Sequence, residues 1–574
     1  MRSYIKERAD RERLICMLDV GLVREASRLI RRIDPSGTSS EAAVIAVMQG
    51  RFEAAREILE ARLESDLPVK ERAIDLLRYA EALAGGGDRL GAVDALERAL
   101  ESDALGAYSR MDARLQLAGL RLEADGPEEA QKELSELETS ALTPLARLRY
   151  EVLTVRAHVG TERSLERMRT AFDSWTREWA ESPLTSRGIE FLDRRKRANV
   201  LAQVLTAEIQ RGGGPRVALG HLMAAQACAT LARRMELQAP TVDELLDLLS
   251  KKDAGLVAFV PGVDQVVLLL ADGSGVAHAF LSVGEIAAAE ASLTSVATDR
   301  SIESRKTYAR VTSKCTDALI PSSLRDRIAG WGSIRFVGLG RISAVPPDLL
   351  RLRGDWLGCV KPCAVWPSVV VGFDLENQRS ISAKGAFALI AADHEKGALP
   401  FGESELAMLE SELGGRSHVL LNGAARLSAL PAERLDLLYV HCHGSLDISR
   451  PRPDTLALGD TIDATAVERT WAHGSAPRMV LLAACGAGRE ESRLGEDGAA
   501  GLVGAFLLGG SQAILAARRE LYHVPTKDVA FAIIQARQEG HSVGEALLQA
   551  RRELIDGGSD PRDVGVLSLF GSLD

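Results

Sequence analysis

The chain has 574 residues, too many for one ordinary core, so we expect two or three globular domains. It is 46% hydrophobic and 26% charged, and its net charge of −10 argues against general DNA binding. No apolar run is long enough to span a membrane, so we expect no direct membrane association. Seven scattered cysteines and a charged start without a signal peptide predict a cytoplasmic location.

Residues 1–240 have the pattern of an α-helical repeat domain, because hydrophobic residues recur every three or four positions. The turns are marked by Gly21, Gly50, Gly87, Gly126 and Gly160. The small residues after these turns are Ala26, Ala55, Ala92 and Ala130. Residues 50–55 match the Gly-x-aromatic-x-x-Ala turn of tetratricopeptide repeats. The pattern predicts an α-solenoid of TPR-like helix pairs, whose concave face suits a regulatory protein partner.

A basic run, Arg-Arg-Lys-Arg at residues 194–197, has two interpretations. It could bind a nucleoprotein or another acidic partner, or it could be the solvated face of a helix. The acidic balance of the chain favours the solvated face. The glycines that follow at 212–214 lack the Lys-Ser/Thr of a phosphate-binding loop.

The next domain is predicted to begin at Thr241, because Thr241 and Glu244 form a capping-box pattern after Pro240. Strands are expected at 256–260, 265–270 and 333–338, the first two joined by a Pro-Gly turn. From residue 385 the pattern alternates between strands and helices, which is typical of an α/β sandwich. Strands are expected at 387–392, 418–421, 435–440, 479–484, 513–517 and 566–570. Helices are expected at 403–413 and 498–508 and after Ser542, which opens a second capping box.

Two of these strands end in reactive side chains followed by glycine. One leads into His441, Cys442, His443 and Gly444, and the other into Cys485, 42 residues after His443. Because ligands gather at the carboxyl ends of parallel strands, Cys485 could act as a nucleophile and His443 as its proton-transfer partner. The alternative is that Cys485 is a small core residue. His441 and His443 would point to the same side if they continued one strand.

These motifs resemble the caspase-like cysteine peptidases, and specifically their separase-related CHAT branch. The resemblance rests on the strand-His-Gly ending at Gly444, the strand-Ala-Cys ending at Cys485, and three later segments. Those segments are Gly-Glu-Asp-Gly at 495–498, Ala-Phe-Leu-Leu-Gly-Gly at 505–510, and a final strand ending in Phe-Gly at 570–571. The likeness extends upstream to about residue 243. It implies a non-catalytic, pseudo-caspase half at 241–384 and a catalytic half at 385–574.

By this resemblance, His443 protonates the leaving amine, and the backbone N–H groups of Gly444 and Cys485 bind the oxyanion. The substrate-recognition pocket departs from that of relatives, which often carry Trp and an acidic residue after the strand at 513–517. Here Glu520 could recognise a basic residue, or Arg518 or Arg519 an acidic one. Asp393 and Asp460 are further candidates at the rim of the site, although surface or turn positions explain them equally well.

The resemblance implies a cysteine endopeptidase of bacterial antiviral defence or cell death, with a gasdermin-type protein as one candidate substrate. The TPR-like domain would regulate it through a protein or nucleoprotein partner. No cofactor is expected, and no metal, because Cys359 and Cys363 lack a second ligand pair. The alternatives are an inactive binding scaffold, and a hydrolase or acyltransferase that acts on something other than protein.

Overall fold

The computed structural model describes most of the chain. The described residues are 29–48, 51–157, 162–181, 189–262, 265–296, 302–338, 346–378, 385–392, 417–431, 433–446, 454–471, 474–485, 487–488, 501–517, 523–560, 562, 565 and 567–574. Its contacts divide the chain into two compact units, Met1–Gly214 and Pro215–Asp574. Each unit is considered separately below.

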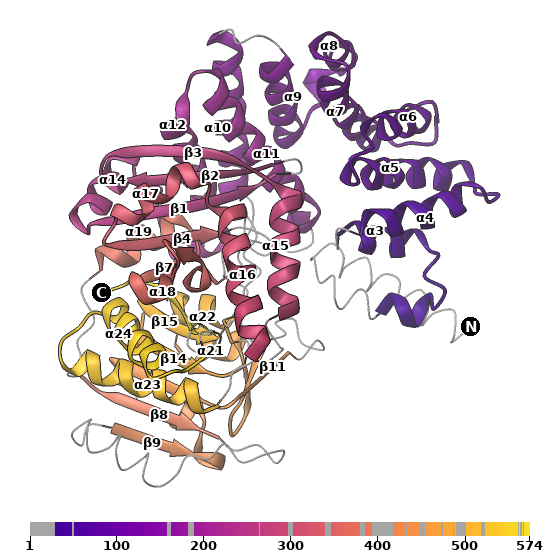
Figure 1. The fold of residues 1–574 in the computed structure, drawn as a ribbon. Coiled ribbons are helices and arrows are strands. Elements are labelled where there is room, and N and C mark those ends of the chain that lie inside the picture. Colours follow the sequence, from indigo (N-terminus) through magenta and orange to yellow (C-terminus); the bar gives the residue numbers. More distant parts are fainter. Residues whose placement is uncertain are drawn as a thin grey trace. The chain divides into compact units, whose positions relative to one another are not determined.

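The first unit consists of consecutive helices that pack as neighbouring pairs (Figure 1). The helices are α3 (Ser40–Met48), α4 (Phe52–Leu63), α5 (Val69–Gly85), α6 (Arg89–Leu100), α7 (Ala107–Ala124), α8 (Pro127–Ser135), α9 (Pro144–Ala157), α10 (Glu162–Glu181) and α11 (Ile189–Arg211). This arrangement fits TPR-like repeats, as the sequence predicts.

The small residues of the repeat pattern lie where helices meet. Ala55, Ala92 and Ala130 are fully buried, which allows the close helix approach expected of them. Gly87 has a φ of +91° between α5 and α6, a conformation that favours glycine and ends the first helix of the pair. Phe52 packs against Gly85, where a Cβ would lie 2.2 Å from the ring. The glycines and alanines of the turn pattern are therefore the positions at which neighbouring helices of the repeats turn and pack closely.

The basic run at 194–197 differs in part from a solvated face. Arg197 is buried, and its guanidinium lies 4.7 Å from the centroid of the Trp179 ring. A cation over an indole face is stabilised by the ring quadrupole, and here it joins α11 to α10. The expectation of a solvated face is therefore wrong for Arg197, while the side chains at 194–196 lie outside the described residues.

The second unit is built on one eleven-stranded sheet, in the order β3-β2-β1-β4-β7-β16-β15-β14-β10-β8-β9. The strands of the first half are β1 (Ala254–Pro261), β2 (Gln265–Asp272), β3 (Gly275–Ser282), β4 (Ser333–Gly338) and β7 (Cys363–Val365). Those of the second half are β8 (Phe387–Ala391), β9 (Ser417–Leu421), β10 (Leu437–His441), β14 (Met479–Ala483), β15 (Ala513–Ala517) and β16 (Leu567–Gly571). β1–β2, β2–β3 and β15–β16 pair antiparallel, and the other neighbours are parallel.

Smaller strands lie outside this sheet. They are β5 (Arg351–Leu352) with β6 (Asp355–Trp356), and β11 (His443–Leu446), β12 (Asp454–Ala457) and β13 (Thr461–Asp463), which form a three-stranded sheet. The helices of this unit are α12 (Gly214–Ala227), α13 (Thr230–Arg234), α14 (Val242–Lys251), α15 (Val283–Val296), α16 (Ile302–Leu319), α17 (Ser322–Gly330), α18 (Leu357–Val360), α19 (Val369–Asn377), α21 (Ala464–Thr470), α22 (Leu502–Leu508), α23 (His523–Gln538) and α24 (Val543–Asp556).

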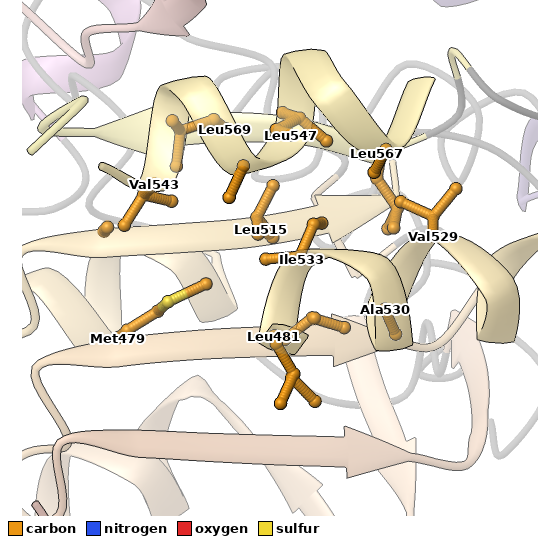
Figure 2. Close-up of a cluster of buried hydrophobic side chains, with 14 of the residues drawn as sticks. Met479, Leu481, Leu515, Val529, Ala530, Ile533, Val543, Leu547, Leu567 and Leu569 are labelled. Atoms are coloured by element: carbon orange, nitrogen blue, oxygen red, sulfur yellow. The ribbon is translucent and has the colours of Figure 1, made fainter. Parts of the chain in front are cut away.

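Helices cover the sheet, so its strands are apolar on both sides. Figure 2 shows Met479, Leu481 and Leu515 of the sheet packed beneath Val529 and Ile533 of α23. Residues of α24, the helix that begins with the second capping box, belong to the same cluster. A second cluster buries β1, β2 and β4 beneath α15, α16 and α17. Each half thus has a hydrophobic core of its own, although one sheet runs through both.

The sequence predictions for this unit are largely confirmed. The strands at 333–338 and 513–517 have the expected limits, and β1 and β2 form the expected hairpin. Both capping boxes form: the hydroxyls of Thr241 and Ser542 accept from the N–H groups of Glu244 and Glu545. The helix expected at 403–413 lies outside the described residues.

The domain limits at 240 and 384 stay predictions. Helices α12 and α13 lie before residue 240 but belong to the second unit, where α13 packs against α19 and α22. The last strand, β16, inserts between β7 and β15, so strands from both sides of residue 384 form one continuous sheet.

Candidate active site

The carboxyl ends of four parallel strands meet at one edge of the sheet. His441, the last residue of β10, is paired with Ala391 of β8 and with Ala483 of β14. The next strand follows in step, because Leu482 is paired with Ala516 of β15. The segments that leave these strands therefore emerge at a common rim, the usual place for a site in a parallel sheet.

The histidine segment changes sheets at this rim. Strand β10 ends at the buried His441, and His443 begins β11 in the three-stranded sheet. The expectation that both histidines continue one strand is therefore wrong, because Cys442 forms a bend between two strands. The centroid of the His441 ring lies 6.0 Å from that of the Tyr439 ring. Tyr439 belongs to the hydrophobic cluster that also contains residues of α23 and α24. His443 is half-buried and leaves the main sheet.

The cysteine segment ends one strand away. After β14, Ala484 is buried and Cys485 is half-buried, while Gly486 lies outside the described residues. The Cys442 N–H donates to the Ala483 carbonyl over 3.4 Å, which extends the contact between the two segments past the last paired residues. Cys442 and Cys485 are thus carried to the same rim from neighbouring strands.

The two segments also lie against each other at Gly444. A Cβ at this position would lie 2.1 Å from the Cys485 carbonyl oxygen and 2.9 Å from the Cys485 nitrogen. No side chain fits in that space without backbone movement. The glycine after the histidine therefore lies directly against the backbone of the cysteine, although 41 residues separate them in the sequence.

The two rim thiols differ in their surroundings. Burial raises the pKa of the Cys442 thiol well above its ordinary value, and the neighbouring Cys485 contributes in the same direction. A thiol in such a place stays protonated and unreactive. Cys485 is half-buried instead, so it is the rim cysteine that a reagent or substrate can approach.

The small sheet that carries His443 is anchored beside the rim. His443 is paired with Ala457 of β12, just before the turn into β13. In that turn the Gly459 N–H donates to the Ala425 carbonyl over 2.8 Å, and Asp460 lies 3.9 Å from Arg426. The turn places Asp460, an exposed residue, at the end of β12 nearest His443.

The other substrate-recognition candidates cannot be located. Asp393 and Glu520 lie outside the described residues, as do Arg518 and Arg519. Their immediate neighbours are at the rim: the Ala392 N–H donates to the His441 carbonyl over 3.1 Å, and Ala517 ends β15. Their roles stay predictions.

In the part of the chain that is described, no three His, Cys, Asp or Glu side chains come together in a group that could hold a metal ion. Cys363 lies within β7, and its thiol donates to the Lys361 carbonyl over 3.4 Å. Cys359 lies in α18. No described helix is both long and apolar enough to cross a membrane.

Sequence reasoning missed Gly488. Gly488 contacts β15 and β16, three residues after Cys485. Its only sequence signal is its place in Cys-Gly-Ala-Gly, which does not distinguish a packing glycine from a turn glycine. The expected packing of His441 and Cys442 is confirmed, since both side chains are buried.

The second unit has an α/β core, in which helices cover a mixed eleven-stranded sheet. Residues 310–564, which are 255 of the 574 residues, match the CHAT domain family. This part of the chain is therefore similar to CHAT domains, the family that its motifs resemble. No curated protein sequence matches the chain.

The solved structures that are similar to the chain include two crystal structures of the Saccharomyces cerevisiae separase–securin complex. The first has 9% identity and a TM-score of 0.49, covering 97% of this chain and 53% of the other. The second has 11% identity and a TM-score of 0.38, covering 99% of this chain and 60% of the other. The chain thus spans little more than half the length of the chains it matches.

Proposed function

We propose that this chain is a cysteine endopeptidase in which Cys485 is the nucleophile and His443 transfers the proton. The observation that carries the proposal is the contact between Gly444 and the Cys485 backbone. It brings the residue after the histidine against the candidate nucleophile at the carboxyl ends of adjacent parallel strands. The match to the CHAT domain supports the same reaction class.

The chemistry is an acyl transfer in two steps. The Cys485 sulfur attacks the peptide carbonyl carbon, and the C–N bond breaks as His443 gives a proton to the leaving amine. The resulting thioester is hydrolysed by water, which restores the thiol. The N–H groups of Gly444 and Cys485 are the proposed donors to the oxyanion, because glycine lets the substrate carbonyl approach the backbone.

Recognition of the substrate side chain is assigned to the loops at the rim. Glu520, after β15, is the proposed acid for a basic residue, and Asp393 and Asp460 are the further candidates. The anchored turn at Gly459 supports Asp460, since it is tied to the sheet that carries His443.

Regulation is assigned to the TPR-like unit, which offers a protein or nucleoprotein partner an extended helical surface. The partner would shift the population of a silent enzyme towards an active one. A reducing, cytoplasmic setting is part of the proposal, since the seven cysteines are scattered through the sequence without a paired framework. A role in bacterial antiviral defence or cell death, with a gasdermin-type substrate, is the biological context that the motifs suggest.

The experiment is co-expression of the full chain with the proteins encoded beside its gene, followed by intact-mass analysis. We expect wild type to cut one neighbour at a single bond, and Cys485→Ala and His443→Ala to leave it intact. Cys359→Ala and His278→Ala are the matched controls, since Cys359 is another half-buried cysteine and His278 an exposed histidine. Cutting that persists in Cys485→Ala contradicts the proposal.

A chain that cuts no neighbour is then tested with an electrophile based on a peptide and with a non-peptide acyl probe. Labelling of Cys485 by the peptide probe alone keeps the endopeptidase and indicates that its partner was missing. Labelling by the acyl probe alone favours a different hydrolase or an acyltransferase. An unreactive Cys485 favours the binding scaffold.

A further inference from the structure

The segment after Cys485 returns to the main sheet within three residues. The Ala487 N–H donates to the Ala484 carbonyl over 3.3 Å, which closes a turn around Cys485. The Gly488 N–H then donates to the carbonyl of Ala517, the last residue of β15, over 2.8 Å. The position of the candidate nucleophile is therefore tied to the end of β15.

Gly488 also packs against the sheet. A Cβ at this position would lie 3.0 Å from the Ala516 Cβ and 3.1 Å from Cε2 of Phe570. Its φ is outside the left-handed region, so packing rather than backbone conformation requires glycine here. Ala516 and Phe570 are both fully buried, and a methyl group at residue 488 must therefore push them or lift the turn.

Phe570 is held on both sides and has little freedom to yield. It lies in β16, where it is paired with Ile514 of β15 and with Val365 of β7. Along the same strand, the Ser568 hydroxyl donates to Asp348 over 3.1 Å, and Arg551 donates to the Leu567 carbonyl over 2.5 Å. The backbone of Phe570 is thus held within the sheet, and its buried ring lies against Gly488.

We propose that Phe570 is a positioning residue for Cys485 and acts through its contact with Gly488. This inference rests on the proposed function and adds a residue that touches neither the substrate nor the reacting atoms. The ring sets how deeply the turn at 484–488 sits on the sheet.

The test is a double-mutant cycle in the full chain with Gly488→Ala, Phe570→Met and both together. Methionine keeps most of the buried volume but removes the ring edge, so it relieves the contact between the added methyl group and Phe570, while the 3.0 Å contact with the Ala516 Cβ remains. Phe570→Leu is the second variant if Phe570→Met does not fold, as judged by circular dichroism. Gly220→Ala is the matched control, because its Cβ would meet only an ordinary contact at 3.6 Å.

The readout is the rate of Cys485 alkylation by iodoacetamide as a function of pH, followed by peptide mass spectrometry. We expect Gly488→Ala to change the rate about tenfold and to shift its pH midpoint, since the thiol moves relative to His443. In the double variant, the change that Gly488→Ala causes should be smaller than it is beside wild-type Phe570, because only the contact with Ala516 remains. Gly220→Ala should stay within about twofold of wild type.

Two results overturn the inference. One is an unchanged rate and pH midpoint in Gly488→Ala. The other is a double variant whose loss equals the product of the two single losses, because independent sites give multiplicative effects. Alkylation needs no substrate, so the cycle decides the positioning role even if wild type cleaves no protein. Absence of cleavage by wild type counts only against the proposed function.

Discussion

Arg551 and Asp348 form an ion pair over 2.6 Å in which both side chains are only 2% exposed. Asp348 lies in the first half of the sheet, in a 3-10 turn at Pro347–Leu349, and Arg551 lies in α24 of the second half. Asp348 also accepts from Ser568 of β16. The pair therefore joins the two halves where their strands meet.

Asp348→Asn should destabilise the second unit strongly, because the guanidinium of Arg551 would stay buried without a counter-charge. Breaking such a pair from one side typically costs about 3–5 kcal/mol. The free energy of unfolding, measured by urea titration with tryptophan fluorescence, checks this. The matched control is Asp326→Asn, which removes an exposed pair with Arg353 and should cost less than about 1 kcal/mol. Equal losses in the two variants would contradict the prediction.

Gly444→Ala should abolish the reactivity of Cys485 with little change in the rest of the fold. A Cβ at residue 444 would overlap the Cys485 carbonyl, so the two segments must move apart. A displacement of about 1 Å at a catalytic group can lower the rate about a hundredfold. Gly423→Ala is the control, since nothing lies within 4 Å of its Cβ. The rate of Cys485 alkylation, and any cleavage of a protein substrate, are compared in wild type, Gly444→Ala and Gly423→Ala. Rates in Gly444→Ala equal to those of wild type would contradict the prediction.

Iodoacetamide at pH 8 should label Cys485 far faster than the buried cysteines of the folded chain. Burial raises the pKa of Cys315 to about 11 and raises the pKa of Cys363 and Cys442 further. Because the thiolate is the nucleophile and a thiol of pKa 11 is only about 0.1% thiolate at pH 8, these buried thiols should react slowly. Timed digestion and mass spectrometry give each rate. Faster labelling of Cys442 than of Cys485 would refute the assignment of the accessible thiol.

The Ser542 capping box should make stability depend on pH through Glu545. Its pKa is lowered by the hydrogen bond from the Ser542 N–H and by that from the Ser542 hydroxyl. Because the pKa of Glu545 is lower in the folded state, its charge stabilises the fold at pH values above the ordinary pKa of 4.5. This stabilisation is lost as the pH falls through the lowered, folded-state pKa.

Glu545→Gln isolates this charge, because glutamine can still accept the same hydrogen bonds. Wild type should unfold at higher urea than Glu545→Gln at pH 7, and the difference should disappear at low pH. A difference that grows as pH falls would have the wrong sign. Ser542→Ala is the comparison that removes the whole cap, at a cost of about 1 kcal/mol.

The elements best predicted from the sequence were those with a strong local pattern. The strand at Ala513–Ala517 is apolar throughout and bounded by polar residues. The start of the helix after Ser542 is marked in the sequence by its capping box. Strand β3 was not predicted, because Val276 to Ser282 mixes small, apolar and polar residues at an edge of the sheet. Edge strands carry a weak pattern, since only part of their surface is buried.

The candidate site was predictable as a pair of motifs but not as a geometry. Residue types and strand ends indicated His443 and Cys485, and parallel pairing predicted a shared rim. The change of sheet at Cys442 could not be predicted, because it depends on pairing between β11 and β12, not on the residues of the bend. Likewise, the packing of Gly488 on Phe570 joins residues 82 apart in the sequence, beyond the reach of any local pattern.

The position of β16 in the sheet has a consequence for biosynthesis. This strand follows all the other described strands in the sequence, yet it lies between β7 and β15. Until residues 567–571 have been made, each of those strands presents an unpaired edge, and such edges are prone to wrong pairing. The contact surface beneath Gly488 is absent for the same interval. During synthesis, the segment at Cys485 therefore lacks this support until β16 has been made.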